Sequence, residues 1–482
     1  MNSFHQTQNL SFLLTEILAE FESAVIINQE GQTLGLRYEV LPDLGTFAPL
    51  VEMASRYFPL NEGDLVLTND PYSGGTTLSV LNFITAFKVG DQKFFLAVRG
   101  RLKPKLSSAK SLEDEGLRIP PTPIATGREM NHALLEIIRS HPMAPEGFFE
   151  KVTQLSQSIW TQVDLVKSWA AKNPTLLSRQ NQKNLLNETQ RRIHKTIDEL
   201  PNGDHRLDLT FETGEVIRLH TEIKDKEVHF DFAGTTHSSR IFLTDQSTYG
   251  TCLGAFLCFL GQDFLINESA FSMIQVTTPK DCLLNAKYPS PIFEGLAEIT
   301  SLLGSAVIQS LAEITKSRSM GLNGSVSTIL TLSFSGGQFF FDPVAGGTGA
   351  TDDSNGLDAF YFWVLSRRQP SIEEIERLYP ITVLQSGIRP DSGGKGKHNG
   401  GHGMIREILV KEAGSLRWLL GHRNIQNKGL KGAQAGKPSE LSVIKASGEE
   451  LVISDPHGEI AVQAGDRILA ASAGGGGLGK SP

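Results

Sequence analysis

The residues best suited to chemistry lie in the segment Gly63–Thr77, where an apolar run leads into a polar, glycine-rich turn. Residues 65–67, Leu-Val-Leu, are typical of a short buried strand. Asn69-Asp70-Pro71 follows, with side-chain oxygens that can bond the backbone of a turn. Gly74-Gly75 then allows the backbone to approach a ligand or another chain closely. The segment predicts a loop of the kind that forms active sites, although its composition alone also fits an ordinary surface turn.

Two further glycine-rich segments follow later in the chain. His398 and His402 lie four residues apart in Lys397–Gly403 and could together ligate a metal. The surrounding glycines also fit a loop that serves backbone shape and interface contact, and this is the interpretation we prefer. The run Gly474–Gly477 has the composition of a flexible terminus, which we favour over a role in close backbone packing.

Several segments occur in an order that connects the chain to a known family. They are Asn69–Thr77, Glu115–Pro121, Asp231–Thr235, Arg389–Gly394 and Gly474–Gly477. Together they resemble the hydantoinase B/oxoprolinase family, whose loop reads approximately NDPY-x-GGTH-x-x-D, and the resemblance extends from about Glu20 to the C-terminus. It implies a hydantoinase A-like partner subunit that uses ATP. It also implies that the two subunits together open a cyclic amide (hydantoin, oxoproline or a lactam) or carboxylate a ketone.

The resemblance also implies a divalent metal held by histidine and carboxylate ligands, which would polarise oxygen and supply hydroxide near neutral pH. At the corresponding positions this chain has Phe21 or Glu22, Thr77, Val80, and Arg101-Leu102 after Arg99-Gly100. Threonine is a poor ligand for such a metal, valine and leucine are not ligands, and arginine repels a cation. Further along, Tyr361 and Trp363 stand where the family carries two histidines.

Residues that shape the backbone are thus retained while the ligands are lost. We interpret the following set as a degenerate family site: Asn69, Asp70, Gly74, Gly75, Thr77, Val80, Arg99, Arg101, Leu102, Tyr361 and Trp363. The hypothesis is a metal-free pseudoenzyme subunit with a structural or regulatory role. It would bind no cofactor itself, and its partner subunits would handle ATP and the divalent metal.

Two alternatives stay open. The chain could be an active B-type subunit that hydrolyses an activated cyclic amide through residues that the resemblance does not mark. It could also be a free-standing binding protein that reuses the scaffold. For the pseudoenzyme and for the active B-type subunit we expect a hetero-oligomer with the hydantoinase A-like subunit, or a homodimer.

Composition narrows the class of protein. A formal charge of −8 over 482 residues argues against a nucleic-acid partner, because phosphate neutralisation needs concentrated Lys and Arg. Cys252, Cys258 and Cys282 have no C-x-x-C spacing, so reduced thiols are expected. No secretory signal and no uninterrupted apolar stretch of membrane-spanning length is visible, so we expect a cytoplasmic protein without a membrane partner.

Hydrophobic periodicity predicts an α+β fold with mixed and antiparallel sheets. Helical spacing is expected over 10–21, 148–171 and 293–314, and a polar helix from about Pro174 to Leu200. Strands are expected near 24–27, 65–67, 81–87 and 94–98, with a hairpin at 89–92, and a meander over 207–232. We divide the chain into an N-terminal α/β lobe (1–126), a helical segment (127–200), a mixed α+β lobe (201–385) and a β-rich C-terminal lobe (386–482).

Overall fold

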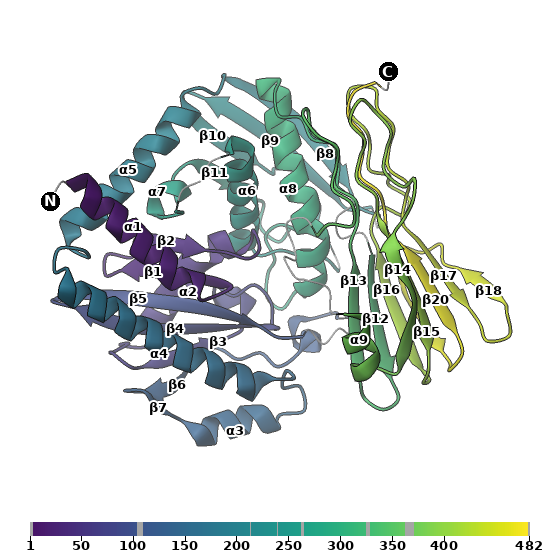
Figure 1. Ribbon diagram of the computed structural model, residues 1–482. Coiled ribbons are helices and arrows are strands. Elements are labelled where there is room, and N and C mark those ends of the chain that lie inside the picture. Colours follow the sequence, from purple (N-terminus) through teal and green to yellow (C-terminus); the bar gives the residue numbers. More distant parts are fainter. Residues whose placement is uncertain are drawn as a thin grey trace. The chain divides into compact units, whose positions relative to one another are not determined.

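The computed structural model describes residues 3–480 except 104–108, 213, 239, 262–264, 324–327 and 362–370. The chain divides into two compact units, coloured mainly purple to teal and green to yellow in Figure 1. The first comprises Met1–Asp204, Glu222–Asp231 and Ser239–Leu296, and the second His205–Thr221, Phe232–Ser238 and Ala297–Pro482. The four-part division given above stays a prediction, whereas the α+β class with several antiparallel sheets is confirmed.

The described helices of the first unit are α1 Ser3–Ala19, α2 Asp43–Tyr57, α3 His132–Ser140, α4 Phe148–Lys172, α5 Arg179–Ile197, α6 Asp245–Leu260 and α7 Glu268–Phe271, with 3₁₀ turns η1 Pro71–Ser73 and η2 Leu112–Glu115. Its described strands are β1 Ser23–Asn28, β2 Thr33–Arg37, β3 Leu65–Thr68, β4 Val80–Val89, β5 Gln92–Arg101, β6 Thr122–Thr126, β7 Glu129–Met130, β10 Glu227–Asp231 and β11 Ile274–Thr277. Three elements begin in one unit and end in the other: β8 Gly203–Thr210, β9 Val216–Lys224 and α8 Phe293–Thr315.

A seven-stranded antiparallel sheet forms the centre of the first unit, in the order β2-β1-β5-β4-β3-β6-β7. The predicted hairpin joins β4 to β5. Alternate strand residues, among them Ala24 and Ile26, share one hydrophobic core with Leu13 of α1 and Val152 of α4. Helix α2 contacts β1 and β5 from the other face. Because both faces are covered, every residue of β1 is buried.

One helix starts later than the sequence predicts, and a second has the composition of a membrane span. Helix α5 begins at Arg179, not Pro174, because the Ser178 side chain caps it by accepting a hydrogen bond from the N–H of Asn181. Helix α8 is the one helix of the described residues with the length and hydropathy of a membrane span, and 83% of its most apolar window is buried inside the protein. That burial is the core position predicted for it.

The strands predicted over 207–232 are present as β8, β9 and β10. The parallel pairing of β10 with β11, in which Val228 lies opposite Ile274, was not predicted. Such pairing joins segments far apart in sequence, so a local alternation pattern carries no sign of it.

The second unit contains α9 Ile372–Leu378 and the strands β12 Thr328–Phe334, β13 Phe339–Val344, β14 Ile381–Ile388, β15 Met404–Val410, β16 Gly414–Leu420, β17 Glu440–Ile444, β18 Glu450–Val452, β19 His457–Val462 and β20 Arg467–Ala471. They form a four-stranded sheet, β13-β12-β16-β19, and a five-stranded sheet, β14-β15-β20-β17-β18. Inward residues of both sheets, such as Leu332 and Ile408, belong to one core. This is a β-sandwich, in agreement with the β-rich C-terminal part predicted.

Glycine-rich segments of the second unit pack backbone against backbone. We call the segments 345–350, 392–403, 427–436 and 473–479 the glycine bundle. The N–H of Gly347 donates to the carbonyl of Ala473 at 3.0 Å, and the N–H of Gly475 donates to the carbonyl of Gly401 at 3.0 Å. A Cβ atom on Gly475 would overlap the carbonyl group of Thr348.

The expectation of a flexible glycine terminus was therefore wrong. Residues Gly474–Gly477 are buried because neighbouring backbones occupy the space that side chains would need. The Nδ1 atom of His402 accepts a hydrogen bond from the N–H of Gly393 at 3.0 Å, so this imidazole supports the same bundle.

We expect Gly475→Ala to destabilise the protein by about 1–3 kcal/mol or more, because the added methyl group must displace backbone. Urea unfolding of the purified variant measures the change in free energy. Gly387→Ala in β14 is the matched control, since a Cβ there would meet no atom within 4 Å. Equal stability of the two variants would contradict the packing described.

Candidate functional site

The loop that follows β3 has the turn chemistry expected from its residues. Asp70 precedes η1, and its carboxylate accepts hydrogen bonds from the N–H of Tyr72 at 3.0 Å and the hydroxyl of Ser73 at 2.8 Å. Gly74 adopts a φ of +88° and lies against the backbone of Leu50, where a Cβ would not fit. The turn is thus tightly built, and Asp70 is fully buried within it.

Asn69 ties this loop to a segment almost fifty residues later. Its side-chain amide donates to the carbonyls of Leu78 at 2.9 Å and Leu117 at 2.8 Å. Its Oδ1 atom accepts from the N–H of Ile119 at 2.6 Å. Every polar atom of the side chain is used in these bonds, so Asn69 holds two loops together.

Arg99 is the most buried cation of the site. It projects from β5, and its guanidinium pairs with Asp43 in a contact whose two side chains are both fully buried. The same guanidinium donates to Asn82 Oδ1 at 2.8 Å and to the carbonyl of Gly74 at 3.1 Å. It lies 4.0 Å from the ring centroid of Phe47. Arg99 therefore joins α2, β4, β5 and the loop.

Arg101 completes the arrangement two residues along β5. It forms an ion pair with Glu39 and another with Asp43 Oδ2 at 2.9 Å. The hydroxyl of Ser23 also donates to Asp43 Oδ2 at 2.6 Å. We call Arg99, Arg101, Asp43 and Glu39 the arginine–carboxylate cluster, in which two positive charges face two negative ones.

The cluster changes the ionisation of its central acid. Burial by itself would raise the pKa of Asp43, but the charges of Arg101 and Arg99 and the bond from Ser23 outweigh it and hold the pKa below its ordinary value. Asp43 is therefore an anion at neutral pH, and both of its oxygens already have cationic partners.

The structure brings most of the predicted site residues to one end of the β4–β5 pair. Val80 lies opposite Arg101, and the hydroxyl of Thr77 hydrogen-bonds that of Ser79 at 3.0 Å. Leu102 is buried and its N–H donates to the carbonyl of Ser79. The residues gathered in this part of the first unit are Asn69, Asp70, Gly74, Gly75, Thr77, Val80, Arg99, Arg101 and Leu102.

Of the remaining two predicted residues, Tyr361 belongs to the second unit. The hydroxyl of Tyr361 donates to the carbonyl of Pro343 at 2.5 Å, and its ring packs on Ile329 and Leu419. Trp363 lies outside the described residues.

Sequence reasoning missed the partners of both arginines. Ser23 belongs to β1 and Asn82 to β4, Glu39 lies in the segment between β2 and α2, and α2 supplies Asp43 and Phe47. Asp43 follows Pro42 and precedes an apolar run, and this pattern predicts only the start of a helix. Nothing in that signal indicates an arginine partner 56 residues away.

A second polar network lies on the other side of Asp70. Arg118 forms an ion pair with Asp70 Oδ2 at 2.7 Å and stacks 4.7 Å from the ring centroid of Tyr288. Tyr288 meets Tyr72 edge-on at 5.6 Å, and its hydroxyl donates to Glu113 at 2.5 Å. An arginine on an aromatic face beside a buried carboxylate is a rigid arrangement.

Glu115 is the unusual acid of this network. Its Oε1 atom accepts from the N–H groups of Ile292 at 2.7 Å and Phe293, the first residue of α8, at 2.8 Å. Its Oε2 atom is buried and has no hydrogen-bond partner among the described residues. Burial raises the pKa of Glu115 to about 7, although the two backbone bonds oppose this.

The donor set does not fit the divalent metal that the resemblance implies. No group of three or more His, Cys, Asp or Glu side chains able to hold a metal occurs in the described part of the chain. Asp43, Glu39 and Asp70 already face guanidinium groups, and Thr77 and Val80 supply no anionic or imidazole donor. We therefore derive no step through a metal at this site.

Comparison with known proteins identifies the class. The family described as hydantoinase B/oxoprolinase matches residues 11–481, and the chain belongs to this family. An uncharacterized protein of Methanocaldococcus jannaschii is 24% identical over 95% of this chain and 84% of its own length. The 5-oxoprolinase of Dictyostelium discoideum is 25% identical over 87% of this chain, which spans only 34% of that protein. The B-type subunit of a putative D-/L-hydantoinase from a Pseudomonas species is 21% identical over 83% of this chain and 73% of its own length.

Solved structures agree on the fold. The ATP-dependent caprolactamase of Pseudomonas jessenii superimposes with a TM-score of 0.86 at 19% identity, over 99% of this chain and 90% of that one. A nucleotide-free acetone carboxylase gives a TM-score of 0.81 at 16% identity, over 98% and 73%.

We expect Asp43→Ala to destabilise the protein by about 3–5 kcal/mol, because it leaves Arg99 buried without its carboxylate. Denaturant unfolding measures the loss. Glu52→Ala is the matched control on the same helix, because its pair with Arg56 is mostly exposed and should contribute only about 0–1 kcal/mol. A loss at Asp43 as small as that at Glu52 would show that the cluster does not hold the site together.

A second prediction concerns pH. The folded state raises the pKa of Glu115 from its ordinary 4.5 to about 7, so the stability tied to its neutral form is complete below pH 4.5 and is lost as pH rises through 7. The free energy of unfolding of the wild type should fall relative to Glu115→Gln by about 2–3 kcal/mol across this range. Thermal or urea unfolding at several pH values measures the difference. Glu129→Gln, at an exposed residue of β7, should leave the wild-type profile unchanged, and a flat difference for Glu115→Gln would refute the assignment.

Proposed function

We propose that this chain is a metal-free B-type subunit of an ATP-dependent cyclic-amide hydrolase or carboxylase assembly, with a structural or regulatory role. The observation that carries the proposal is the arginine–carboxylate cluster. Arg101 stands at a position where the resemblance implies a metal ligand, and together with Arg99 it occupies the oxygens of the nearby acids Asp43 and Glu39 in a buried position.

Electrostatics supports this reading. Two like unit charges 4 Å apart near a protein surface repel each other by about 4 kcal/mol, and a divalent ion would experience a larger repulsion from each guanidinium. Arg99 cannot turn away without leaving the Oδ1 atom of Asp43 and the carbonyl of Gly74 without their donor. A cation could enter only at the expense of the contacts that hold the loop.

Partner subunits are the second part of the proposal. One relative is named as a B-type subunit of a putative hydantoinase, and this chain spans about a third of the 5-oxoprolinase it matches. Both facts support a partner subunit. We propose that this partner is hydantoinase A-like and binds ATP, and that the hetero-oligomer is cytoplasmic. A homodimer of this chain is the other arrangement we consider.

A second candidate function is an active B-type subunit that acts on an activated cyclic amide. Glu115 favours it, because a buried carboxylate with a free oxygen and a pKa near 7 can take up and release a proton at neutral pH. Arg118 and Tyr288, near Asp70, would bind or orient a polar ligand in this network. In this reading Glu115 would be the acid–base group.

Two measurements test the proposal. Elemental analysis should find no stoichiometric Zn, Mn or Fe in the purified protein, and a chelator should leave its melting temperature unchanged within about 1 °C. A metal present at 100 times its dissociation constant would stabilise the fold by about 2.7 kcal/mol, which corresponds to about 3 °C for a chain of 482 residues. Bound metal that is lost in Asp70→Asn would contradict the proposal.

Turnover separates the two candidates. The chain is co-expressed with its hydantoinase A-like partner and assayed for ATP hydrolysis with hydantoin, oxoproline and lactams. If the chain is a metal-free structural subunit, the ATP hydrolysis of the complex should be the same for Glu115→Gln as for the wild type. Product formation that requires this chain and is abolished by Glu115→Gln, but not by Glu129→Gln, would establish the active subunit instead.

A further inference from the structure

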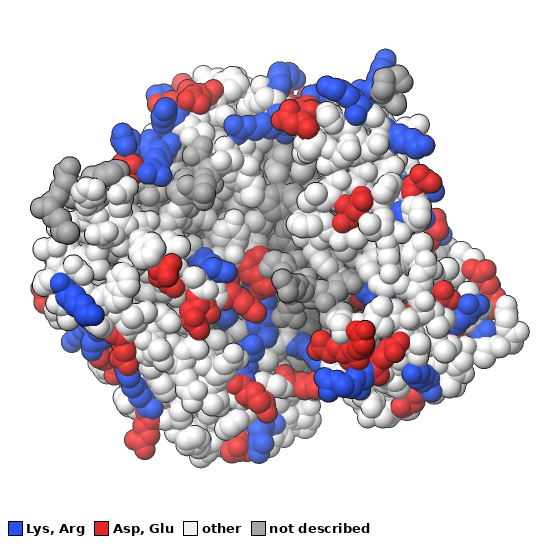
Figure 2. Space-filling model, in the orientation of Figure 1, with Lys and Arg blue, Asp and Glu red and all other residues white. Residues whose placement is uncertain are grey.

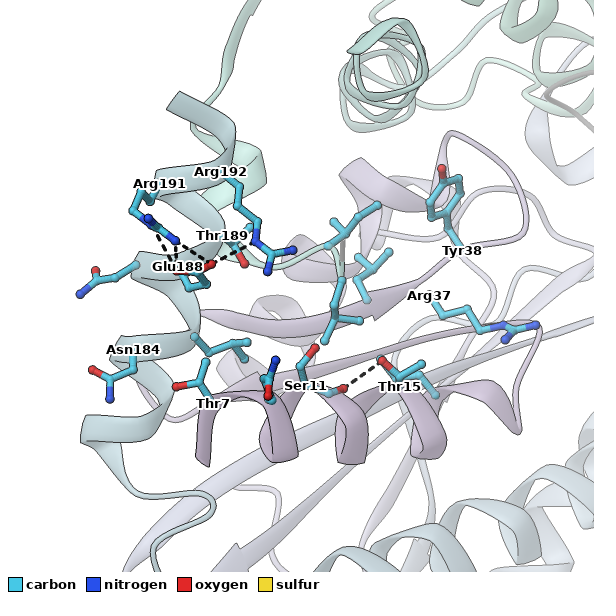
Figure 3. Close-up of a pocket in the computed structure, with 17 residues that line it drawn as sticks. Thr7, Ser11, Thr15, Arg37, Tyr38, Asn184, Glu188, Thr189, Arg191 and Arg192 are labelled. Carbon is cyan, nitrogen blue, oxygen red and sulfur yellow. Dashed lines mark hydrogen bonds and ion pairs between the residues drawn. The ribbon is translucent and has the colours of Figure 1, made fainter. Parts of the chain in front are cut away.

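The first unit carries an open cavity of about 790 Å³ that is separate from the loop described above (Figure 3). Helix α1 forms its floor, α5 one wall, and the end of β2 the opposite side. Leu265 and Ile266 also line it. A volume of this size is typical of small-molecule sites in proteins.

The floor of the cavity is polar in a regular way. Thr7, Ser11 and Thr15 recur every four residues of α1 and so lie on one face of the helix. The buried leucines of α1, such as Leu13, belong to the hydrophobic core instead. Apolar contact within the cavity comes from the partly buried Leu265, among others. A ligand here would meet hydroxyl groups together with an apolar surface.

The wall formed by α5 is positively charged. Glu188 accepts hydrogen bonds from Arg191 Nη2 at 2.9 Å and from Arg192 Nε at 3.1 Å. In Figure 3, Arg192 extends from α5 toward the middle of the cavity. Its Nε atom is fixed by Glu188, while its two terminal nitrogens have no partner among the described residues. The glutamate thus orients the arginine without using the nitrogens that face the cavity.

The opposite side offers further donors. Arg37 and Tyr38 lie across from α5 in Figure 3, and neither side chain has a hydrogen-bond or ion-pair partner within the described ranges. Burial raises the pKa of Tyr38 to about 12, so its hydroxyl keeps its proton at neutral pH and can donate.

Charge sets the chemical class of the ligand. The lining holds three arginines but a single acid, Glu188, in a protein whose formal charge is −8. Figure 2 shows basic side chains gathered where Figure 1 places α5, which also carries Lys183 and Lys195. The donors left over in the cavity need an acceptor with negative charge.

We propose that this cavity binds a small organic anion, a carboxylate or a phosphate monoester with an apolar body. Arg192 contacts the anionic group, and Tyr38 and the hydroxyl group of Ser11 complete its hydrogen bonds, since the hydroxyls of Thr7 and Thr15 already donate to Asn181 and to the carbonyl of Ser11. Leu265 and the other apolar residues of the lining cover the apolar part. The site is independent of the arginine–carboxylate cluster and of any metal.

The test uses four compounds that share a benzene ring: phenyl phosphate, phenylacetate, benzyl alcohol and benzylamine. Isothermal titration calorimetry of the full chain at physiological salt should show binding of at least one of the two anions, and no binding of the neutral or cationic compound. The stronger anion distinguishes a phosphate site from a carboxylate site. Arg192→Gln should weaken the binding at least tenfold, since a hydrogen bond to a charged group contributes about 1.5–3 kcal/mol.

Lys195→Gln is the matched control, because it removes one positive charge from the same helix outside the cavity lining. It should change the affinity less than twofold. The proposal is overturned if neither anion binds, if benzyl alcohol binds as tightly as the anions, or if Arg192→Gln and Lys195→Gln weaken binding equally.

Discussion

The pairing of Arg99 with Asp43 inside the first unit is the interaction on which the candidate site depends. A guanidinium removed from water is tolerated only when its donors are satisfied, and here Asp43, Asn82 and the carbonyl of Gly74 satisfy them while Phe47 covers its face. Since these partners lie on α2, β4 and the loop, one side chain fixes three elements against β5. The guanidinium of Arg99 thereby fixes the position of the loop.

The same contact explains how a member of this family can keep its scaffold without the ligand set that the resemblance implies. Arg99 and Arg101 place permanent positive charges beside Asp43 and Glu39, and Arg118 does the same beside Asp70 of the loop. Asn69 and Asp70 then serve as structural residues, one linking two loops and the other capping η1. In the described residues the site has its charges balanced and most of its polar atoms bonded, which is typical of a stable core.

Much of the fold could be predicted from the sequence, because the elements concerned have strong local patterns. The leucines of α1 recur at helical spacing, and the β4–β5 hairpin follows from two apolar runs around a turn at residues 89–92. The turn at Asp70 could also be predicted, because Asn, Asp, Pro and Gly are the residue types that favour such turns. The threonine at residue 77 and the arginine at residue 101, where the family carries histidine, were visible too.

What could not be predicted depends on contacts between distant segments. Gly474–Gly477 was interpreted as flexible because composition does not show that other backbones pack against it. The sequence around Asp43 and Glu39 gives no sign of their pairing with β5. The raised pKa of Glu115 follows from its burial in the folded chain, which its local sequence does not show. Which residue pairs with a buried charge depends on the tertiary structure. The residues next to that charge in the sequence do not reveal its partner.

The most direct measurement is anomalous diffraction from crystals grown with Mn²⁺ or Zn²⁺, with data collected at the absorption edge of the metal. The account predicts no anomalous peak near Asp43 or Asp70, and density for the Arg99 guanidinium between Asp43 and Phe47. A peak within coordination distance of either carboxylate, with Arg99 turned away, would contradict it.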